Sequence, residues 1–492
     1  MKYNYINLME ENLTSKTIKG TGWSALDNIL QYAISFVVSI VLARLLSPDE
    51  YGLIGIVAIF TAISTTIING GFTSALIRKK DASEDDYDTV FIVNLCVSIA
   101  LYCVLFLIAP LLAKFFDREE LIALTRVQSL SLIIGALAIV QRARLTKRID
   151  FKTQTKATFI AAVVSGFLGI IAALLGYGVW SLVIHLLTQM GIMTGLLWFY
   201  NKWIPRFRFS IDSFKELFGY SWKLLVSGLL DTTWKHVYQL VIGKFYAPAT
   251  LGQYTRASQF SEIFSSNLTN IVQRVSFPVL SSIQDNSDRL RNAYQRIIKA
   301  TMLITFSLML GLAAISKNMI LVLIGEKWLM AAAFLPLICF QMMLYPLHAI
   351  NLNMLQVKGR SDLFLKLEIA KKIIGVLPIL LGIFIDIYWM LVGSVLTGFI
   401  SYYLNAYYSG ELLGYSFRQQ IADISSSFAI SLFMGIVVYL VGMLPFTPIL
   451  LLISQITLGV FLLVILCETF HLREYLDMKN LVLSHMKSHR NK

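Results

Sequence analysis

The fold is decided by a short segment at residues 42–55, which reads LARLLSPDEYGLIG and joins two long apolar runs. A similar segment, IGKFYAPATLGQYT, occupies residues 242–255. The two segments correspond at Pro48 and Pro248, at Gly52 and Gly252, and at Arg44 and Lys244. Because proline fixes φ and glycine adopts backbone angles that other residues resist, each segment is predicted to be a tight helix–turn–helix link. Its recurrence predicts that the chain contains two copies of one structural unit.

The composition is that of a membrane protein. The 492 residues are 57% hydrophobic and only 14% charged, with a mean hydropathy of +0.68, whereas a soluble domain is about half apolar and a quarter charged. The net charge of +13 would point to nucleic acid in a soluble chain. Here the cations gather in alternate short loops and indicate orientation in a bilayer, so no nucleic-acid partner is expected. Residues 1–22 lack an apolar core and a small-residue cleavage site, and no signal peptide is expected.

The apolar runs predict an all-α polytopic protein with about fourteen transmembrane helices, since about 20 apolar residues cross a bilayer. The predicted spans are 23–45, 51–77, 89–113, 121–145, 157–176, 179–200, 218–246, 251–280, 294–315, 329–355, 363–385, 387–408, 424–444 and 446–468.

Lysine and arginine are concentrated in every second connection between these spans. They gather at residues 78–80, 142–152, 202–215, 289–296 and 358–360, while the intervening loops are shorter and poorer in cations. By the positive-inside rule both termini are predicted to be cytoplasmic, which agrees with an even number of helices.

The repeat continues beyond the opening segment. Residues 176–183, GYGVWSLV, correspond to residues 386–393, DIYWMLVG, through Trp180 and Trp389. Parallel repeats of six helices form two lobes related by an axis along the membrane normal, with a cavity between them. We therefore predict a cytoplasmic segment at 1–22, an N-lobe at 23–210, a C-lobe at 211–410, two additional helices at 411–470 and a cytoplasmic tail at 471–492.

Polar residues inside the spans are the candidate site. Asp231, Lys235 and Gln239 recur at intervals of four along one helix face. Ionisable side chains at membrane depth usually face a bundle interior or a water-filled cavity. Substrate binding is predicted for Lys235, Arg256, Gln239, Gln259, Asn270, Gln31 and Asn69, and ion coupling for Asp231, Glu262 and Asp27. The alternative is that Asp231 and Lys235 form a structural ion pair and that the polar faces only join helices.

Signatures of enzymes are missing from the sequence. It contains no phosphate-binding glycine loop, no dinucleotide turn, no zinc-ligand spacing and no nucleophile elbow. We therefore predict no catalytic residue, no metal and no cofactor, and we expect a secondary transporter driven by an ion gradient.

Six sequence motifs resemble a known family. They are TIKGTGWSAL (17–26), VLARLLSPDEYGLIGI (41–56), GGFTSALIRK (70–79), GYGVWSLV (176–183), FPVLSSIQDN (277–286) and GEKW (325–328). Together they resemble the polysaccharide-transporter branch of the multidrug/oligosaccharidyl-lipid/polysaccharide superfamily, in particular Wzx-type flippases of the colanic-acid and teichuronic-acid exporter group. The resemblance covers about residues 15–470.

The resemblance implies a MATE-like fold, with two six-helix lobes that open alternately to each face of the bacterial cytoplasmic membrane. It implies that undecaprenyl-pyrophosphate-linked oligosaccharides are flipped for cell-surface polysaccharide synthesis, driven by a proton or sodium gradient. A polysaccharide polymerase and chain-length machinery are possible partners besides the membrane lipids. The resemblance assigns no individual residue, because relatives vary within the cavity.

Three alternatives stay open at this point. The chain is a drug or metabolite antiporter of the same superfamily, a membrane enzyme such as a polysaccharide polymerase or acyltransferase, or a scaffold that does not transport. The enzymes usually need a large external loop or a histidine-centred site, and the sequence shows neither.

Overall fold

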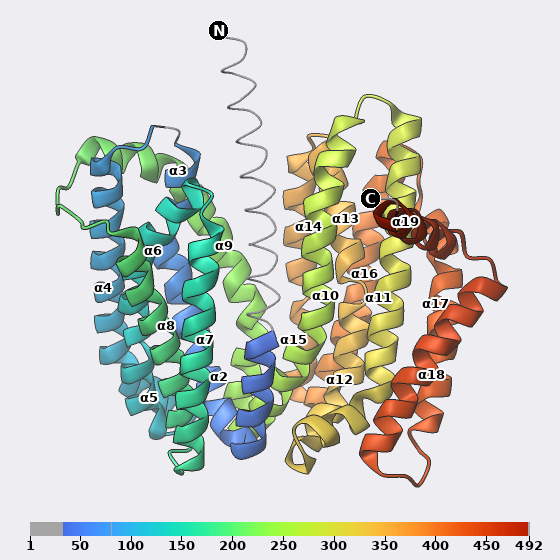
Figure 1. Ribbon diagram of the computed structural model, residues 1–492, viewed down its shortest axis with the longest axis horizontal. Helices are drawn as coiled ribbons and strands as arrows, with labels where there is room; N and C mark the ends of the chain where they lie inside the picture. Colours follow the sequence, from blue (N-terminus) through green and yellow to red (C-terminus); the bar gives the residue numbers. More distant parts are fainter. Residues whose placement is uncertain (1–32, 80, 491–492) are drawn as a thin grey trace. The chain divides into compact units, whose positions relative to one another are not determined.

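The computed structural model describes residues 33–79 and 81–490, and every regular element in these residues is a helix (Figure 1). The chain forms two compact units, Met1–Gly252 and Gln253–Lys492. The first contains the helix Ala33–Leu45, α2 (Pro48–Asn69), α3 (Phe72–Arg78), α4 (Glu84–Phe116), α5 (Glu120–Gln128), α6 (Leu130–Lys147), α7 (Phe151–Leu174), α8 (Trp180–Asn201) and α9 (Ile211–Phe245). The predicted all-helical fold class is confirmed.

The second unit continues from a helix that begins in the first. Its elements are α10 (Pro248–Ser282), α11 (Ser287–Leu323), η1 (Glu326–Trp328), α12 (Leu329–Met342), α13 (Tyr345–Val357), α14 (Ser361–Ile374), α15 (Val376–Phe384), α16 (Ile387–Leu413), α17 (Phe417–Val441), α18 (Pro448–Thr469) and α19 (Arg473–Arg490).

Many helices begin where the sequence supplies a cap. At the start of α2 the Ser47 hydroxyl accepts a hydrogen bond from the Glu50 amide (3.3 Å), and the Glu50 carboxylate accepts one from the Ser47 amide (2.6 Å). Ser83 and Asp86 form the same reciprocal pair at the start of α4. Such capping boxes satisfy amides that have no partner within the helix.

The two repeated segments meet within the first unit, where Pro48 and Pro248 begin α2 and α10. A β-carbon on Gly52 would lie 1.8 Å from the Pro248 carbonyl oxygen, and one on Gly252 would lie 2.0 Å from that of Pro48. Neither glycine has a positive φ. The prediction that glycine provides an unusual backbone angle here is therefore wrong. Glycine is needed because two backbones approach too closely for any side chain.

Ten segments of the described residues are long and apolar enough to cross a membrane. They are Pro48–Arg78, Glu84–Phe116, Glu120–Lys147, Phe151–Leu174, Trp180–Asn201, Ser287–Leu323, Glu326–Val357, Ile387–Leu413, Phe417–Val441 and Pro448–Thr469.

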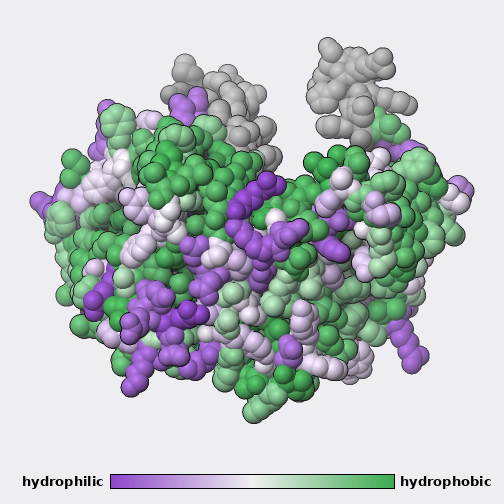
Figure 2. Space-filling model, turned by 90° about the horizontal axis from the view of Figure 1, so that it is seen from below, coloured by the Kyte–Doolittle hydropathy of each residue, from purple (hydrophilic) through white to green (hydrophobic). Residues whose placement is uncertain are grey.

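The surface of these helices suits a bilayer. Large apolar side chains such as Leu107 (73% exposed) and Phe461 (61% exposed) point outward, and hydrophobic residues cover much of the surface in Figure 2. Helices α9 and α10 are long but carry the polar residues noted above, and α14 and α15 divide one predicted span. The count of fourteen therefore stays a prediction.

Helix α9 packs against α2, α3 and α4 of the first unit. The hydroxyls of Thr66 and Thr232 are 3.0 Å apart, and the rings of Phe72 and Phe214 stack with centroids 6.4 Å apart. The sequence repeat places α9 at the start of the C-lobe, whereas compactness groups it with the N-lobe helices. The lobe boundaries predicted from the repeat stay a prediction.

In the second unit a buried polar network joins α11, α13, α16 and α17. The Tyr294 hydroxyl donates to Asn351 Oδ1 (2.7 Å), which also accepts from the Ser409 hydroxyl (2.8 Å) and the Gln420 amide (3.3 Å). Farther along α11, Asn318 donates to Gln455 of α18 (2.9 Å). Helices α17 and α18, which correspond to the two additional helices predicted from the sequence, are thus packed into the core of this unit.

Candidate functional site

The predicted polar stripe of α9 lies largely on the surface of the first unit. Asp231 and Lys235 are exposed, whereas Gln239 is half-buried. The Gln239 side chain lies 2.6 Å from His236 Nδ1, within hydrogen-bonding distance. Asn69, at the end of α2, is also exposed. In a helix at membrane depth, exposed ionisable side chains require water or a polar ligand nearby.

The polar residues of α10 divide into a buried and an exposed group. Arg256 is only 5% exposed, donates to Gln259 Oε1 (2.9 Å) and lies 5.8 Å from the centre of the Trp328 ring. Gln259, Glu262 and Asn270 are exposed. The structure thus brings together Arg256 and Gln259, which the sequence predicted as separate contacts for substrate. The two remaining candidates, Asp27 and Gln31, lie outside the described residues.

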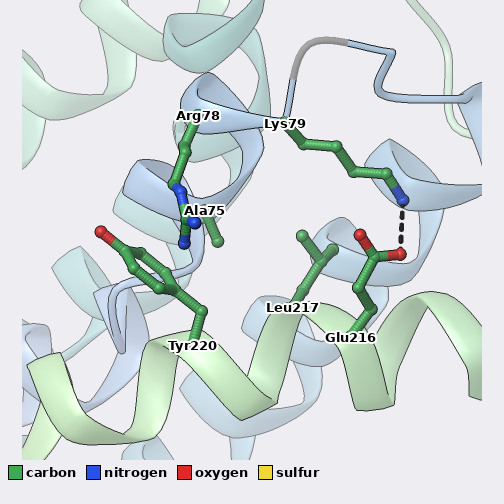
Figure 3. Close-up of a pocket in the computed structure, with 6 residues that line it drawn as sticks. All are labelled: Ala75, Arg78, Lys79, Glu216, Leu217 and Tyr220. Atoms are coloured by element: carbon green, nitrogen blue, oxygen red, sulfur yellow. Dashed lines mark hydrogen bonds and ion pairs between the residues drawn. The ribbon is translucent and has the colours of Figure 1, made fainter.

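A second polar feature lies between α3 and α9, where a pocket of about 370 Å³ is lined by Ala75, Arg78, Lys79, Glu216, Leu217 and Tyr220. In Figure 3 the Arg78 side chain points at the Tyr220 ring and that of Lys79 at Glu216. The buried Ala75 and Leu217 belong to the hydrophobic core of the unit. The pocket therefore combines an apolar floor with a charged rim.

The local sequence explains how α3 reaches α9. Gly70 and Gly71 have φ of 45° and 79° and end α2, so that the short helix α3 begins separately at Phe72. A β-carbon on Gly71 would lie 3.0 Å from Leu224 Cβ of α9. This close approach places the last residues of α3 beside the first turns of α9.

Ion pairs fix the rim of the pocket. Lys79 Nζ lies 3.0 Å from Asp86 Oδ1 and 2.8 Å from Glu216 Oε2. The side chain of Asp86 is 1% exposed and that of Glu216 is 62% exposed. The hydrogen bond to Glu216 raises the pKa of Lys79 above its usual value, with partial burial opposing the shift and Asp86 adding to it. Lys79 is therefore a permanent cation at neutral pH.

Sequence reasoning missed this pocket. Arg78 and Lys79 served only as indicators of orientation, and Glu216 and Tyr220 were not singled out. The signal was present, because Glu216 and Tyr220 are four residues apart and share a face of α9. The packing of α9 on α3 that completes the site comes from the tertiary structure.

Among described residues, no group of three or more His, Cys, Asp or Glu side chains has a geometry that would hold a metal ion. The described polar side chains can bind molecules that carry charge or form hydrogen bonds.

Comparison with known families and proteins shows which of them this chain is similar to. The family described as "Polysaccharide biosynthesis protein" matches residues 41–333. The chain is 27% identical over 357 residues to the teichuronic acid biosynthesis protein TuaB of Bacillus subtilis, covering 72% of this chain and 73% of that protein. It is 25% identical over 448 residues to the lipopolysaccharide biosynthesis protein WzxC of Escherichia coli, covering 88% of each.

Solved structures share the fold. The lipid II flippase MurJ, in an inward closed conformation, superposes with a TM-score of 0.72 at 16% identity, over 92% of this chain and 99% of that chain. An inward-facing multidrug resistance MATE transporter of the MOP superfamily gives a TM-score of 0.61 at 16% identity, over 78% of this chain and 95% of that chain. These similarities confirm the predicted MATE-like helical architecture.

Proposed function

Because the chain belongs to the polysaccharide biosynthesis protein family, whose matching region spans residues 41–333, we propose that it flips lipid-linked oligosaccharide repeat units across the bacterial cytoplasmic membrane. The chain is a multi-pass membrane transporter rather than an enzyme. Its relatives are named for teichuronic acid and lipopolysaccharide biosynthesis. The proposed cargo is an oligosaccharide attached to undecaprenyl pyrophosphate.

One observation supports this function above the others: polar, exposed faces occur on two long helices of a membrane protein. Asp231 and Lys235 on α9, and Gln259 and Glu262 on α10, are all exposed. A sugar head with a pyrophosphate cannot cross hydrocarbon unaided, because removing its water costs many kcal/mol. Polar faces of this kind are proposed to replace the lost hydration while the polyprenyl tail stays in lipid.

The proposed mechanism is alternating access coupled to an ion gradient. Lys235 is proposed to attract the pyrophosphate, and Arg256 to contribute positive charge through its bond to Gln259 (2.9 Å). Asp231 or Glu262 is proposed to bind and release the proton or sodium ion. The ion and the cargo must each bind the two states with different affinity, because otherwise the gradient cannot bias the cycle. Asp27 and Gln31 are proposed to belong to the same route.

A drug or metabolite antiporter is the second candidate, favoured by the structural similarity to a MATE transporter. Such an antiporter needs no site for a diphosphate and releases a free solute. A polymerase is a third possibility, and it acts only after its substrate has crossed the membrane. Polymerase and chain-length proteins are proposed as partners of the flippase rather than as its own activity.

Leaflet assignment of the cargo tests the proposal. Deleting the gene in its host is expected to leave lipid-linked repeat units in the cytoplasmic leaflet, where added glycosidase cannot reach them in intact spheroplasts. Re-expression is expected to restore access. Accumulation in the outer leaflet of the deletion strain would identify a polymerase, and efflux of a free solute without any change in repeat units would identify an antiporter.

A further inference from the structure

The pocket between α3 and α9 lies beside the end of one apolar segment and the start of the next. Arg78 is the last residue of one apolar segment, Pro48–Arg78, and the next segment begins at Glu84. Residues 79–83 are therefore the whole connection between two membrane spans. The cations Arg78 and Lys79 stand at the ends of these spans, which is the level of the phosphates in a bilayer.

Arg78 is held in place without being neutralised. Its guanidinium carbon lies 4.5 Å from the centre of the Tyr220 ring, and the residue is exposed. Within the described part of the chain no carboxylate forms an ion pair with it. An aromatic face orients a guanidinium but leaves the N–H donors at its edge available for a planar anion such as phosphate.

Lys79 forms ion pairs with two carboxylates, one buried and one exposed. Asp86 is buried and also accepts a hydrogen bond from the Ser83 amide (2.8 Å) at the start of α4. Glu216 is mostly exposed, and an exposed ion pair contributes little to stability. An incoming phosphate can therefore replace Glu216 at Lys79 without disturbing Asp86.

A third cation lies close to the pocket. Lys147 Nζ donates to the carbonyl oxygen of Lys79 (2.6 Å). Lys147 does not line the pocket, and among the described residues it has no carboxylate partner. The charged residues that line the pocket are two cations, Arg78 and Lys79, and one carboxylate, Glu216. The excess charge favours an anion over a neutral ligand.

We propose that this pocket binds the phosphate of a lipid headgroup, with Arg78 and Lys79 as the phosphate contacts and Glu216 as the internal competitor. The lipid is either the polyprenyl diphosphate of the cargo or an anionic phospholipid, since both present a phosphate at this depth. The inference rests on the proposed function only for the first of these sources. Binding at the pocket is expected to release Glu216 of α9 from its ion pair with Lys79, which follows α3.

The test measures lipid binding to the purified full-length protein by native mass spectrometry. The probes are undecaprenyl diphosphate, phosphatidylglycerol, and their phosphate-free counterparts, undecaprenol and diacylglycerol. The variants are Arg78→Gln, Lys79→Gln and Glu216→Gln. Lys215→Gln is the matched control, because Lys215 is an exposed cation on the same turn of α9 that does not line the pocket.

Arg78→Gln and Lys79→Gln are each expected to weaken binding of a phosphate lipid by about tenfold, as loss of a charge-assisted hydrogen bond does. Glu216→Gln is expected to strengthen binding, and Lys215→Gln to leave it unchanged. If Arg78→Gln and Lys79→Gln lose binding of undecaprenyl diphosphate alone, the pocket is a site for the cargo. If they also lose binding of phosphatidylglycerol, the pocket is a general site for lipid headgroups.

Two results would overturn the inference: equal binding by all four variants, or an equal loss in Lys215→Gln, which would indicate non-specific attraction. The stronger lipid binding expected for Glu216→Gln can be measured even if Arg78→Gln or Lys79→Gln unfolds. Leaflet assignment of the cargo is a separate measurement. Normal flipping by Arg78→Gln or Lys79→Gln, with lipid binding lost, would exclude the cargo as the lipid at this pocket and leave the proposed function standing.

Discussion

Gly52 lies against the backbone of Pro248, and the reverse pair repeats the contact. A β-carbon at Gly52 would be 1.8 Å from the Pro248 carbonyl oxygen, and one at Gly252 would be 2.0 Å from that of Pro48. The two repeated segments are thus in contact with each other, and each glycine lies beside the proline of the other segment.

Gly52→Ala is therefore expected to force the two turns apart. Overpacking of a closely packed contact costs about 1–3 kcal/mol, so the melting temperature of the purified protein should fall. Gly252→Ala is expected to do the same, because the contact is reciprocal.

The matched control is Gly191→Ala, also within a helix, where an added β-carbon meets no atom within 4 Å. That change is expected to be neutral or to stabilise by up to about 1 kcal/mol. If Gly52→Ala were as harmless as Gly191→Ala, the backbone contact would not be part of the folded protein in the membrane.

A second prediction concerns the carboxylates proposed to couple transport to a gradient. In proteoliposomes, the double variant Asp231→Asn, Glu262→Gln is expected to lose the stimulation of flipping by an imposed proton or sodium gradient. An amide keeps the size of each side chain but cannot exchange a proton or hold a cation by charge. The readout is the ratio of flipping rates with and without the gradient.

Asp285→Asn is the control for this ratio, because Asp285 is an exposed carboxylate in the turn after α10. It is expected to keep the wild-type ratio. Wild-type stimulation of the double variant would remove both residues from the coupling mechanism, while a gradient effect of sodium alone would identify the ion.

A third prediction concerns the polar network in the second unit. Tyr294 is fully buried, and its hydroxyl donates to Asn351 (2.7 Å). Tyr294→Phe removes the donor and leaves a buried acceptor with fewer partners, which costs about 1–3 kcal/mol. Thermal unfolding should show this loss, while Tyr407→Phe, at a tyrosine that is 56% exposed, should change stability little. Equal melting temperatures would show that the network adds nothing to stability.

The sequence was sufficient for the helical architecture because apolar runs of membrane length and the Pro48–Gly52 repeat are local signals. The sequence was less informative where tertiary packing determines the burial and the neighbours of a side chain. The position of Arg256 in a polar stripe did not reveal that it is buried beside Trp328, and its contact with substrate stays a prediction. The pocket at Arg78 depends on α9 crossing α3, and no spacing within either helix encodes that crossing.

The last prediction tests orientation and the helix count together. Cations follow the predicted second, fourth, sixth, eighth and tenth spans, so both termini are expected to be cytoplasmic. A fluorescent protein fused after Lys492 should fold and fluoresce, because it matures in the cytoplasm. Alkaline phosphatase fused within residues 442–447, which join α17 and α18, should be active, because it needs the oxidising exterior. Each reporter exchanged to the other position should be silent. An active phosphatase at the C-terminus would contradict the predicted orientation. With a cytoplasmic N-terminus it would mean that the number of crossings is odd, and that either α9, α10 or the α14–α15 pair does not span the membrane.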